Sequence, residues 1–239
     1  MQGSGSPRTG RILNRLISAL PPTLGKGILA GCEQVQLALG DVLHEPWEPI
    51  REVYFPTHSY IVLVIPAGGE DNLNVGLIGN EGMLGASMIL GGEASPFRAQ
   101  VRGAGTAWQM RAGAFHDAIE QWPAFERVLH RYLQVRFIQF AQMAACTRFH
   151  FVEQRLARLL LVTQDRAQAS DFFVTHDALA AMLGVRRVGI TKAANALKLR
   201  NLIQYHRGTV RILDRRGMKR AACSCYQADQ DTYARLFNR

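Results

Sequence analysis

Three basic side chains, Arg186, Arg187 and Lys192, lie at the start of a segment with helical periodicity, residues 186–199. An arginine fork can donate two hydrogen bonds to guanine O6 and N7, and a lysine in the next turn can reach a second base or a phosphate. Val188 stands between these cations and could contact a thymine methyl group. Two adjacent arginines can also be a solvated helix surface, so the elements that carry them decide between these interpretations.

The segment "HDALAAMLGVRRVGITKAANALKLRNLIQY", residues 176–205, divides into two apolar-periodic parts at Gly184. Glycine adopts positive φ without a Cβ clash, and we also expect a small residue where two steeply crossing helices approach each other. Thr175 is placed to cap the first helix, and Asp177 lies in its first turn. The spacing predicts a helix-turn-helix whose second helix, 186–199, enters the DNA major groove by its N-terminal end. A pair of core helices is the alternative on spacing alone.

A β-hairpin is predicted directly after this recognition helix. In "LIQYHRGTVRILD", apolar residues alternate on both sides of a turn at 206–208, and a short β-prone segment, 172–175, precedes the motif. Such a hairpin is the wing of a winged helix-turn-helix, and Arg207 and Arg211 would bring positive charge to the DNA phosphates. Three further residues are candidate DNA contacts: His176, Gly189 and Thr191.

The formal net charge of +9 is concentrated in this part of the chain. Residues 1–149 contain twelve Lys/Arg and twelve Asp/Glu, whereas residues 150–226 contain fourteen basic and five acidic residues, and 14 − 5 = 9. The last segment, 227–239, has two of each sign. A one-sided excess of positive charge around a helix-turn-helix favours a double-stranded DNA partner over a core hairpin.

The first half of the chain has a different pattern. Residues 10–38 show helical patterning interrupted at Pro21-Pro22. From Gly40 to about Phe115, short β-branched and aromatic runs alternate with turn-forming residues. This rhythm predicts a small antiparallel barrel or sandwich.

A long helix is predicted over residues 123–149, and an amphipathic helix follows over 151–167. The apolar stripe of the long helix has a period near 3.5 residues. This period favours pairing with a second copy of the chain over packing on the barrel alone. A dimer would double the contacts across a two-fold DNA site. The candidate dimerisation residues are Leu129, Leu133, Phe137, Phe140 and Ala144.

The segment "VTHDALAAMLGVRRVGITKAANALKLRNLIQYHRGTVRILDRRGMKRAACSCY" resembles the helix-turn-helix of the Crp/Fnr family of bacterial transcription regulators. The family commonly has an LA-x-x-LGV-x-R core there, and many members have a Cys-x-Cys-Tyr tail. The order of elements over residues 10–226 also resembles the family. At the position of Val188 many members have a glutamate that accepts from cytosine, so we expect a different operator sequence.

This resemblance implies an α+β fold with an N-terminal antiparallel β-roll (a double-stranded β-helix, cyclic-nucleotide-binding-like), a long dimerisation helix and a C-terminal winged helix-turn-helix. It also implies a homodimer that binds palindromic operators and contacts RNA polymerase. The domains expected from it are a disordered leader (1–9), the β-roll (10–122), the dimerisation helix (123–149), the DNA-binding domain (150–226) and a tail (227–239).

The ligand pocket that the resemblance implies departs from a cyclic-nucleotide site. The glycines Gly82 and Gly85 are kept, but Met83 replaces the acid for the ribose, and Arg98 has no hydroxyl residue after it. Unmatched ribose and phosphate groups would cost about 1–3 kcal/mol each, so we do not expect cAMP to bind in the standard mode. No other cofactor is expected. Arg98, together with the nearby Ser95, could bind another anion or could simply be solvated. The sensor is then either responsive to a different small molecule or absent.

Other function classes find no support in the sequence. There is no nucleophile elbow, HExxH motif or P-loop, so an enzyme is not expected. No metal site is expected, because Cys223-x-Cys225 has no second cysteine pair and an iron–sulfur sensor would need clustered cysteines. With no membrane-length apolar run and no signal peptide, we expect a cytoplasmic protein that does not bind membranes.

Overall fold

Short strands in the first half of the chain form two antiparallel sheets, and the second half is mainly helical. The computed structural model describes residues 14–66 and 72–237, so the predicted leader, 1–9, lies outside the described residues. The strands of the first half are β1 (Glu33–Leu37), β2 (Val42–His44), β3 (Glu52–Pro56), β4 (Tyr60–Pro66), β5 (Asn72–Ile78), β6 (Arg98–Gly103) and β7 (Gly105–Arg111).

One sheet has the order β1-β7-β3 and the other β2-β6-β4-β5, and every pair is antiparallel. The inward residues of both sheets are apolar and almost fully buried, among them Phe55, Ile61 and Val101. This is the predicted antiparallel β-roll. One expectation was wrong, because Glu33–Leu37 is strand β1 rather than part of a helical region. Its apolar residues alternate with polar ones, and it pairs with β7.

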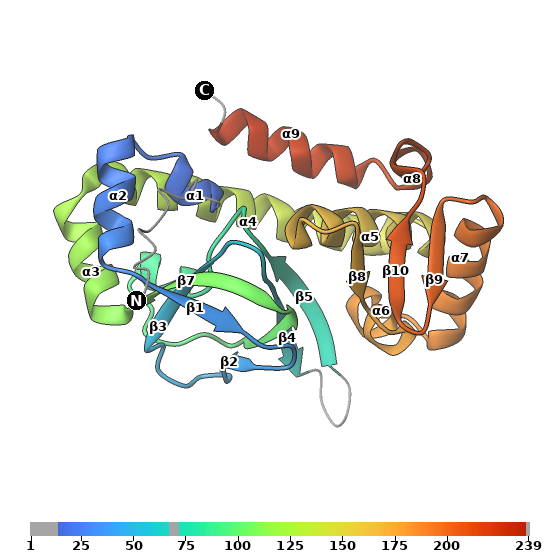
Figure 1. Cartoon of the computed structure of the whole chain (residues 1–239), viewed down its shortest axis with the longest axis horizontal. Coiled ribbons are helices and arrows are strands. Elements are labelled where there is room, and N and C mark those ends of the chain that lie inside the picture. Colours follow the sequence, from blue (N-terminus) through green and yellow to red (C-terminus); the bar gives the residue numbers. More distant parts are fainter. Residues whose placement is uncertain (1–13, 67–71, 238–239) are drawn as a thin grey trace, which may run out of the picture.

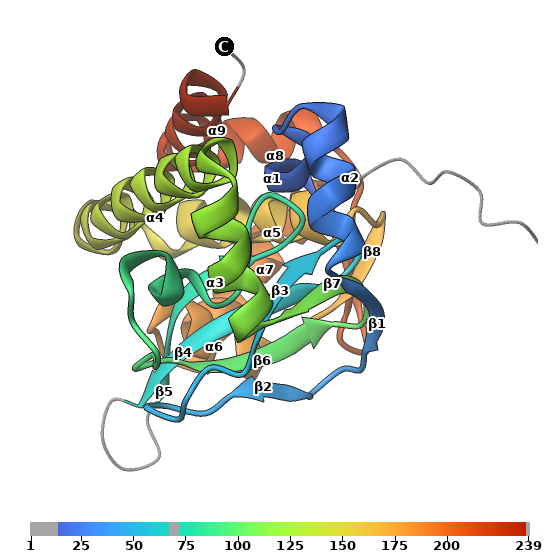
Figure 2. The ribbon, with the colours of Figure 1, turned by 90° about the vertical axis from the view of Figure 1, so that its left-hand side faces the viewer.

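Helices cover one side of the β-roll (Figure 2). They are α1 (Arg15–Ser18), α2 (Pro22–Ala30), α3 (Ala112–Gln121) and the 27-residue α4 (Pro123–Phe149), and a short 3-10 helix η1 (Ala86–Leu90) lies in the roll. The break at Pro21-Pro22 is confirmed, since α1 ends before it and α2 begins at Pro22. Phe115, Phe125, Leu129 and Tyr132 close the core between the roll and α4.

The C-terminal half contains a three-stranded sheet together with several helices, and one face of the sheet packs against the helical core (Figure 1). Its elements are α5 (Val152–Ala167), β8 (Asp171–Phe173), α6 (His176–Leu183), α7 (Arg187–Leu199), β9 (Ile203–His206), β10 (Thr209–Ile212), α8 (Arg215–Ala221) and α9 (Cys225–Phe237). The sheet order is β8-β10-β9, with both pairs antiparallel. A separate apolar core holds α5, α6 and α7 together.

Most of the segment expected as a tail, 227–239, belongs to helix α9. This helix returns along α4 toward the β-roll (Figure 1). Tyr233 on α9 donates a hydrogen bond to the Glu81 carbonyl (3.0 Å), and the Arg15 guanidinium lies 4.0 Å above the Tyr233 ring. Helix α9 therefore connects the C-terminal half to the roll.

Candidate nucleic-acid interface

The turn between α6 and α7 has the geometry that its residues predict. Thr175 caps α6 by accepting a hydrogen bond from the Ala178 N–H (3.1 Å). Gly184 ends α6 with φ of 60°, and the Val185 N–H returns to the Ala180 carbonyl (3.1 Å). A Cβ on Gly184 would have only Leu73 Cδ1 nearby, at 3.4 Å. Backbone conformation, rather than crowding between the helices, therefore requires glycine here.

The N-terminal turn of α7 presents its basic side chains to solvent. Arg186 is the N-cap residue, and Arg187 and Lys192 are also exposed, while Ile190 is buried in the core. Val188 is also exposed, at 60%. One face of the helix is thus free to enter a groove. Asn195, one turn beyond Lys192, is exposed on the same face and is a further candidate DNA contact. It was missed from the sequence, although its position three residues after Lys192 could have indicated it.

The ion pairs of this half leave the predicted DNA face positive. Each of the five acidic residues between positions 150 and 226 pairs with an arginine, in the pairs Glu153–Arg200, Asp165–Arg215, Asp171–Arg211, Asp177–Arg187 and Asp214–Arg220. Arg186, Lys192 and Arg207 have no acidic partner among the described residues. Arg187 has only a 3.5 Å pair in which both side chains are about two-thirds exposed, at 68% and 67%. Such a pair is weak and can be exchanged for a base or phosphate.

The predicted wing is confirmed as the β9–β10 hairpin. Its two turn residues, Arg207 and Gly208, both have positive φ, 47° and 84°, which is the pattern of a type I′ turn. A Cβ on Gly208 would lie 2.4 Å from the Phe173 ring, so this position also needs glycine for space. Arg207 extends from the tip and is exposed. Arg211 is instead held by Asp171 across β10 and β8, at 2.6 and 2.5 Å.

His176 and Thr191 contact each other between α6 and α7. His176 Nδ1 lies 3.1 Å from Thr191 Oγ1, and Thr191 also donates to the Arg187 carbonyl (3.2 Å). The imidazole lies against the Tyr205 ring, with centroids 4.6 Å apart. Burial, followed by the Arg187 charge, lowers the His176 pKa. His176 and Thr191 thus join the two helices, and His176 also contacts the wing. Both are half-buried, so only part of each side chain is open to the predicted contact with the DNA backbone.

A cavity of about 190 Å³ lies between the β-roll and α4. Three of the predicted effector residues, Met83, Gly85 and Ser95, line it. Two predicted residues do not. Gly82 packs against Tyr132, where a Cβ would meet the phenol oxygen at 2.4 Å. Arg98 points to the surface and pairs with Glu45 at 3.1 Å, because its position in β6 faces away from the cavity.

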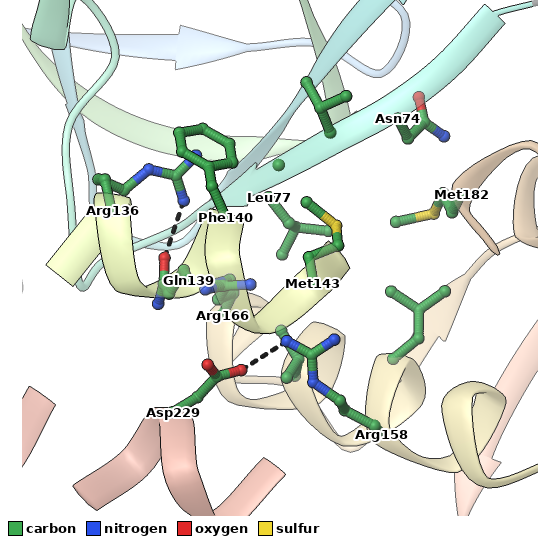
Figure 3. A pocket seen from close by; sticks show the side chains of 14 residues that line it. Asn74, Leu77, Arg136, Gln139, Phe140, Met143, Arg158, Arg166, Met182 and Asp229 are labelled. Carbon is green, nitrogen blue, oxygen red and sulfur yellow. Dashed lines mark hydrogen bonds and ion pairs between the residues drawn. The ribbon is translucent and has the colours of Figure 1, made fainter. Parts of the chain in front are cut away.

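Arg136 of α4, rather than Arg98, brings a guanidinium to the cavity. Its side chain is buried (7% exposed), donates to Gln139 (3.0 Å) and lies over the Phe140 ring (4.9 Å). Figure 3 draws a second pocket, which Arg136 and Phe140 also line, and shows the guanidinium beside Gln139 and Phe140. The second guanidinium nitrogen, Nη2, has no hydrogen-bond partner in the described structure. A Cβ on Gly76 would lie 2.5 Å from Nη2, so glycine is required there for the arginine to fit.

Two more buried polar atoms at the cavity are also unpaired within the described residues, His44 Nδ1 and Ser87 Oγ. His44 uses its other ring nitrogen on the Glu52 carbonyl (3.0 Å), and burial lowers its pKa. The rest of the lining is mainly apolar, including Met83, Leu84 and Phe137. An apolar cavity with a few convergent polar groups is the usual form of a small-molecule site.

Glu81, which follows the roll's turn at Gly79, connects the two halves of the chain rather than facing the cavity. Its carboxylate accepts from the Gly79 N–H (3.1 Å) and pairs with Arg166 of α5 at 2.8 Å. Both side chains are largely buried, at 11% and 13% exposed. The glycine turn of the roll is thus tied to the first helix of the DNA-binding half.

The predicted dimerisation stripe on α4 divides between two faces. Leu129 is fully buried in the chain's own core, so it was wrong as an interface residue. Leu133 is half-buried, and Phe140 stacks on Phe97, with ring centroids 6.4 Å apart. Phe137 is 68% exposed, and Ala144 is exposed too. The outer face of α4 therefore keeps an apolar surface, but a smaller one than the sequence predicted.

Comparison with protein families identifies one domain of this molecule. Residues 154–221 match the family model of the Crp-like helix-turn-helix domain. This range contains α6, the turn at Gly184, α7 and the wing. The C-terminal half therefore contains a Crp-like helix-turn-helix domain.

Solved structures share the fold of this chain along most of its length. Against FixK2 from Bradyrhizobium japonicum the TM-score is 0.68 at 12% identity, covering 81% of this chain and 98% of that one. The c-di-GMP-responsive regulator CLP from Xanthomonas campestris gives 0.65 at 14%, covering 81% and 100%. TTHA1359, a CRP/FNR-family regulator from Thermus thermophilus, gives 0.65 at 21%, covering 80% and 98%. No match was found among curated proteins.

Within its described residues, this chain has no helix that is both long enough and apolar enough to span a membrane.

Proposed function

We propose that this chain is a Crp/Fnr-type transcription regulator that binds palindromic operators as a homodimer, with the recognition helix α7 in the major groove. The observation that carries the proposal is the exposed N-terminal turn of α7. There Arg186 and Lys192 have no acidic partner among the described residues, and Arg187 has only a weak one. Arginine and lysine at this end of a recognition helix can reach base edges, and Val188 between them suits a thymine methyl group. The wing would add a phosphate contact through Arg207.

The outer face of α4 supports the dimer. Phe137, Ala141 and Ala144 are exposed and lie at helical spacing on one face. Pairing of this face with a second copy would cover the exposed phenyl ring and place two α7 helices on one duplex. Contact of the DNA-bound dimer with RNA polymerase follows from the resemblance and belongs to the same proposal.

Selection from genomic DNA, followed by affinity measurements against salt, tests this function. Arg187→Ala should cost about 1–3 kcal/mol on the selected operator and relax its specificity, whereas Arg207→Ala should weaken operator and random DNA alike. Arg51→Ala removes the same charge from the β-roll and is the matched control, with no expected effect on affinity. Binding without a salt slope, or equal losses for Arg187→Ala on both DNAs, would contradict base readout by this helix.

A second candidate function is control of DNA binding by a small molecule in the roll cavity. The unpaired buried atoms of His44, Ser87 and Arg136 favour it, because each leaves a desolvated polar group for a ligand to satisfy. We infer a ligand with an apolar body and one anionic group for the Arg136 guanidinium. CLP, a protein of similar fold, is described as responsive to c-di-GMP, so cyclic dinucleotides belong in the test beside apolar carboxylates.

Thermal-shift screening with these compounds tests the sensor. A ligand at 100 times its Kd should stabilise the protein by roughly 2.7 kcal/mol. Arg136→Met keeps the length of the side chain without its charge and should abolish the shift, whereas Arg98→Met should leave it unchanged. If no compound shifts the wild-type protein, or if the Arg136 variant responds equally, the cavity is not the sensor site.

A further inference from the structure

Three cysteines and a histidine meet at the end of α4. Cys146 lies in the last turns of α4 and His150 directly after it, one helical turn apart. Cys223 and Cys225 come from the connection between α8 and α9. The three sulfurs and a ring nitrogen lie within 4.8 Å of one another. The cysteines are buried and the histidine is half-buried, so the cluster is enclosed on most sides.

The distances in this thiol–imidazole cluster fit a single tetrahedral ion. With zinc–sulfur bonds of about 2.3 Å and zinc–nitrogen bonds of about 2.0 Å, tetrahedral geometry separates two sulfurs by about 3.8 Å and a sulfur from a nitrogen by about 3.6 Å. Here Cys146 Sγ and Cys223 Sγ are 3.6 Å apart, and Cys225 Sγ and His150 Nδ1 are 3.4 Å apart. Side chains that differ by 77 positions in the sequence have thus converged to ligand spacing.

Neighbouring donors are placed to support charged sulfur ligands. Gln142 Nε2 lies 3.0 Å from Cys225 Sγ, and Arg158 Nη1 lies 4.0 Å from Cys146 Sγ. Three thiolates and one divalent ion leave a net charge of −1, and Arg158 places a guanidinium beside it whose Nη2 also pairs with Asp229 at 2.6 Å. Donors of this kind orient metal ligands and tune their basicity.

The chemistry of the ligands selects the ion. Three thiolates with one imidazole in a closed tetrahedron are the ligand set of structural zinc sites, whereas Mg²⁺ and Ca²⁺ take oxygen ligands. The alternative use of the same atoms is a disulfide between Cys146 and Cys223. Their 3.6 Å separation is that of two free thiols, well beyond a bond of about 2.05 Å.

We propose that Cys146, His150, Cys223 and Cys225 bind one structural Zn²⁺ ion. The ion replaces the thiol protons, which are released to solvent, and His150 coordinates through Nδ1. The site would fix the start of α9 to the end of α4, immediately before α5 begins. It would thereby hold the DNA-binding half in place relative to the long helix.

Metal analysis of the purified full-length protein, prepared with reductant and then loaded with zinc alone, tests the site. One zinc per chain is expected, and Co²⁺ substitution should give visible d–d bands together with thiolate-to-metal charge-transfer absorption. Cys223→Ser should lose the zinc and the charge-transfer bands, whereas Cys32→Ser should keep both. Cys32 is the matched control, because it is the one cysteine outside the cluster.

Thiol titration of the wild-type protein tests the site even if Cys223→Ser does not fold, because it needs no variant. With zinc bound, only Cys32 should react with a thiol reagent under native conditions, and a chelator should expose the three cluster thiols. The proposal is overturned if reduced wild-type protein retains no zinc, or if Cys223→Ser retains as much as wild type. It is equally overturned if the cluster thiols are lost to a Cys146–Cys223 disulfide in protein that holds no metal.

Discussion

Replacing Gly184 by alanine isolates the physical reason for the glycine between α6 and α7. The residue has φ of 60°, and a Cβ there would meet only Leu73 Cδ1 at an ordinary 3.4 Å. Crowding therefore adds nothing, and the cost of the change is the left-handed backbone, about 1–2 kcal/mol for an L-residue with a Cβ. Alanine also restricts the unfolded chain, which returns about 0.4–1 kcal/mol. We expect a net loss of about 1 kcal/mol in the free energy of unfolding.

Urea and thermal denaturation of the full-length protein, followed by far-UV circular dichroism, measure this loss. In a chain of this size, 1 kcal/mol lowers Tm by about 2–4 °C. Gly184→Asn should lose less than Gly184→Ala, since asparagine tolerates the left-handed region. Gly189→Ala is the matched control, because nothing lies within 4 Å of a Cβ there and the residue is helical. The reasoning is refuted if alanine at position 184 is neutral, or if asparagine costs more than alanine.

Three further predictions concern α4 and the β-roll. Phe137→Glu should lower the dimer fraction in sedimentation experiments while changing monomer stability by no more than about 0.5 kcal/mol, since the ring is 68% exposed; an unchanged dimer would place the interface elsewhere. Gly82→Ala should destabilise the protein by about 1–3 kcal/mol in urea, because its Cβ would lie 2.4 Å from the Tyr132 hydroxyl; a neutral effect would mean that the phenol moves freely. The folded-state pKa of His44 is lowered by burial, so the unfolded chain binds the proton more tightly and stability falls as pH decreases below about 6.5. His44→Gln should reduce the stability lost between about pH 7.5 and 5.5, and an unaltered pH dependence would exclude this histidine as its source.

The DNA-binding half could be predicted from sequence because its signals are local. The cap at Thr175, the break at Gly184 and the hairpin at Gly208 each depend on residues a few positions away. The predicted recognition helix, 186–199, differs from α7 only in that Arg186 is its cap. Strand β1 was missed because its signal is not local: the strand that it pairs with, β7, lies far along the chain.

The cavity and the cysteine cluster could not be predicted in the same way. The family pattern allows Arg98 either to bind an anion or to be solvated, and the sheet directs it to Glu45 on the surface. Arg136 comes to the cavity from α4, and its guanidinium lies against Gly76 of β5, a long-range contact without a local pattern. Cys223 and Cys225 lacked a second ligand pair in sequence, and the fold supplies it from Cys146 and His150.

Helix α4 links distant parts of this protein mechanically. Within one unbroken helix, Arg136 touches the cavity, Phe137 faces outward and His150 stands at the far end, about 21 Å from Arg136 at 1.5 Å per residue. If α4 moves as a rigid body, a small rotation about its axis or a small translation along it displaces all of its residues together. A molecule that moved Arg136 would therefore shift the outer face at Phe137 and the start of the C-terminal half together, with no relay of rearranging side chains.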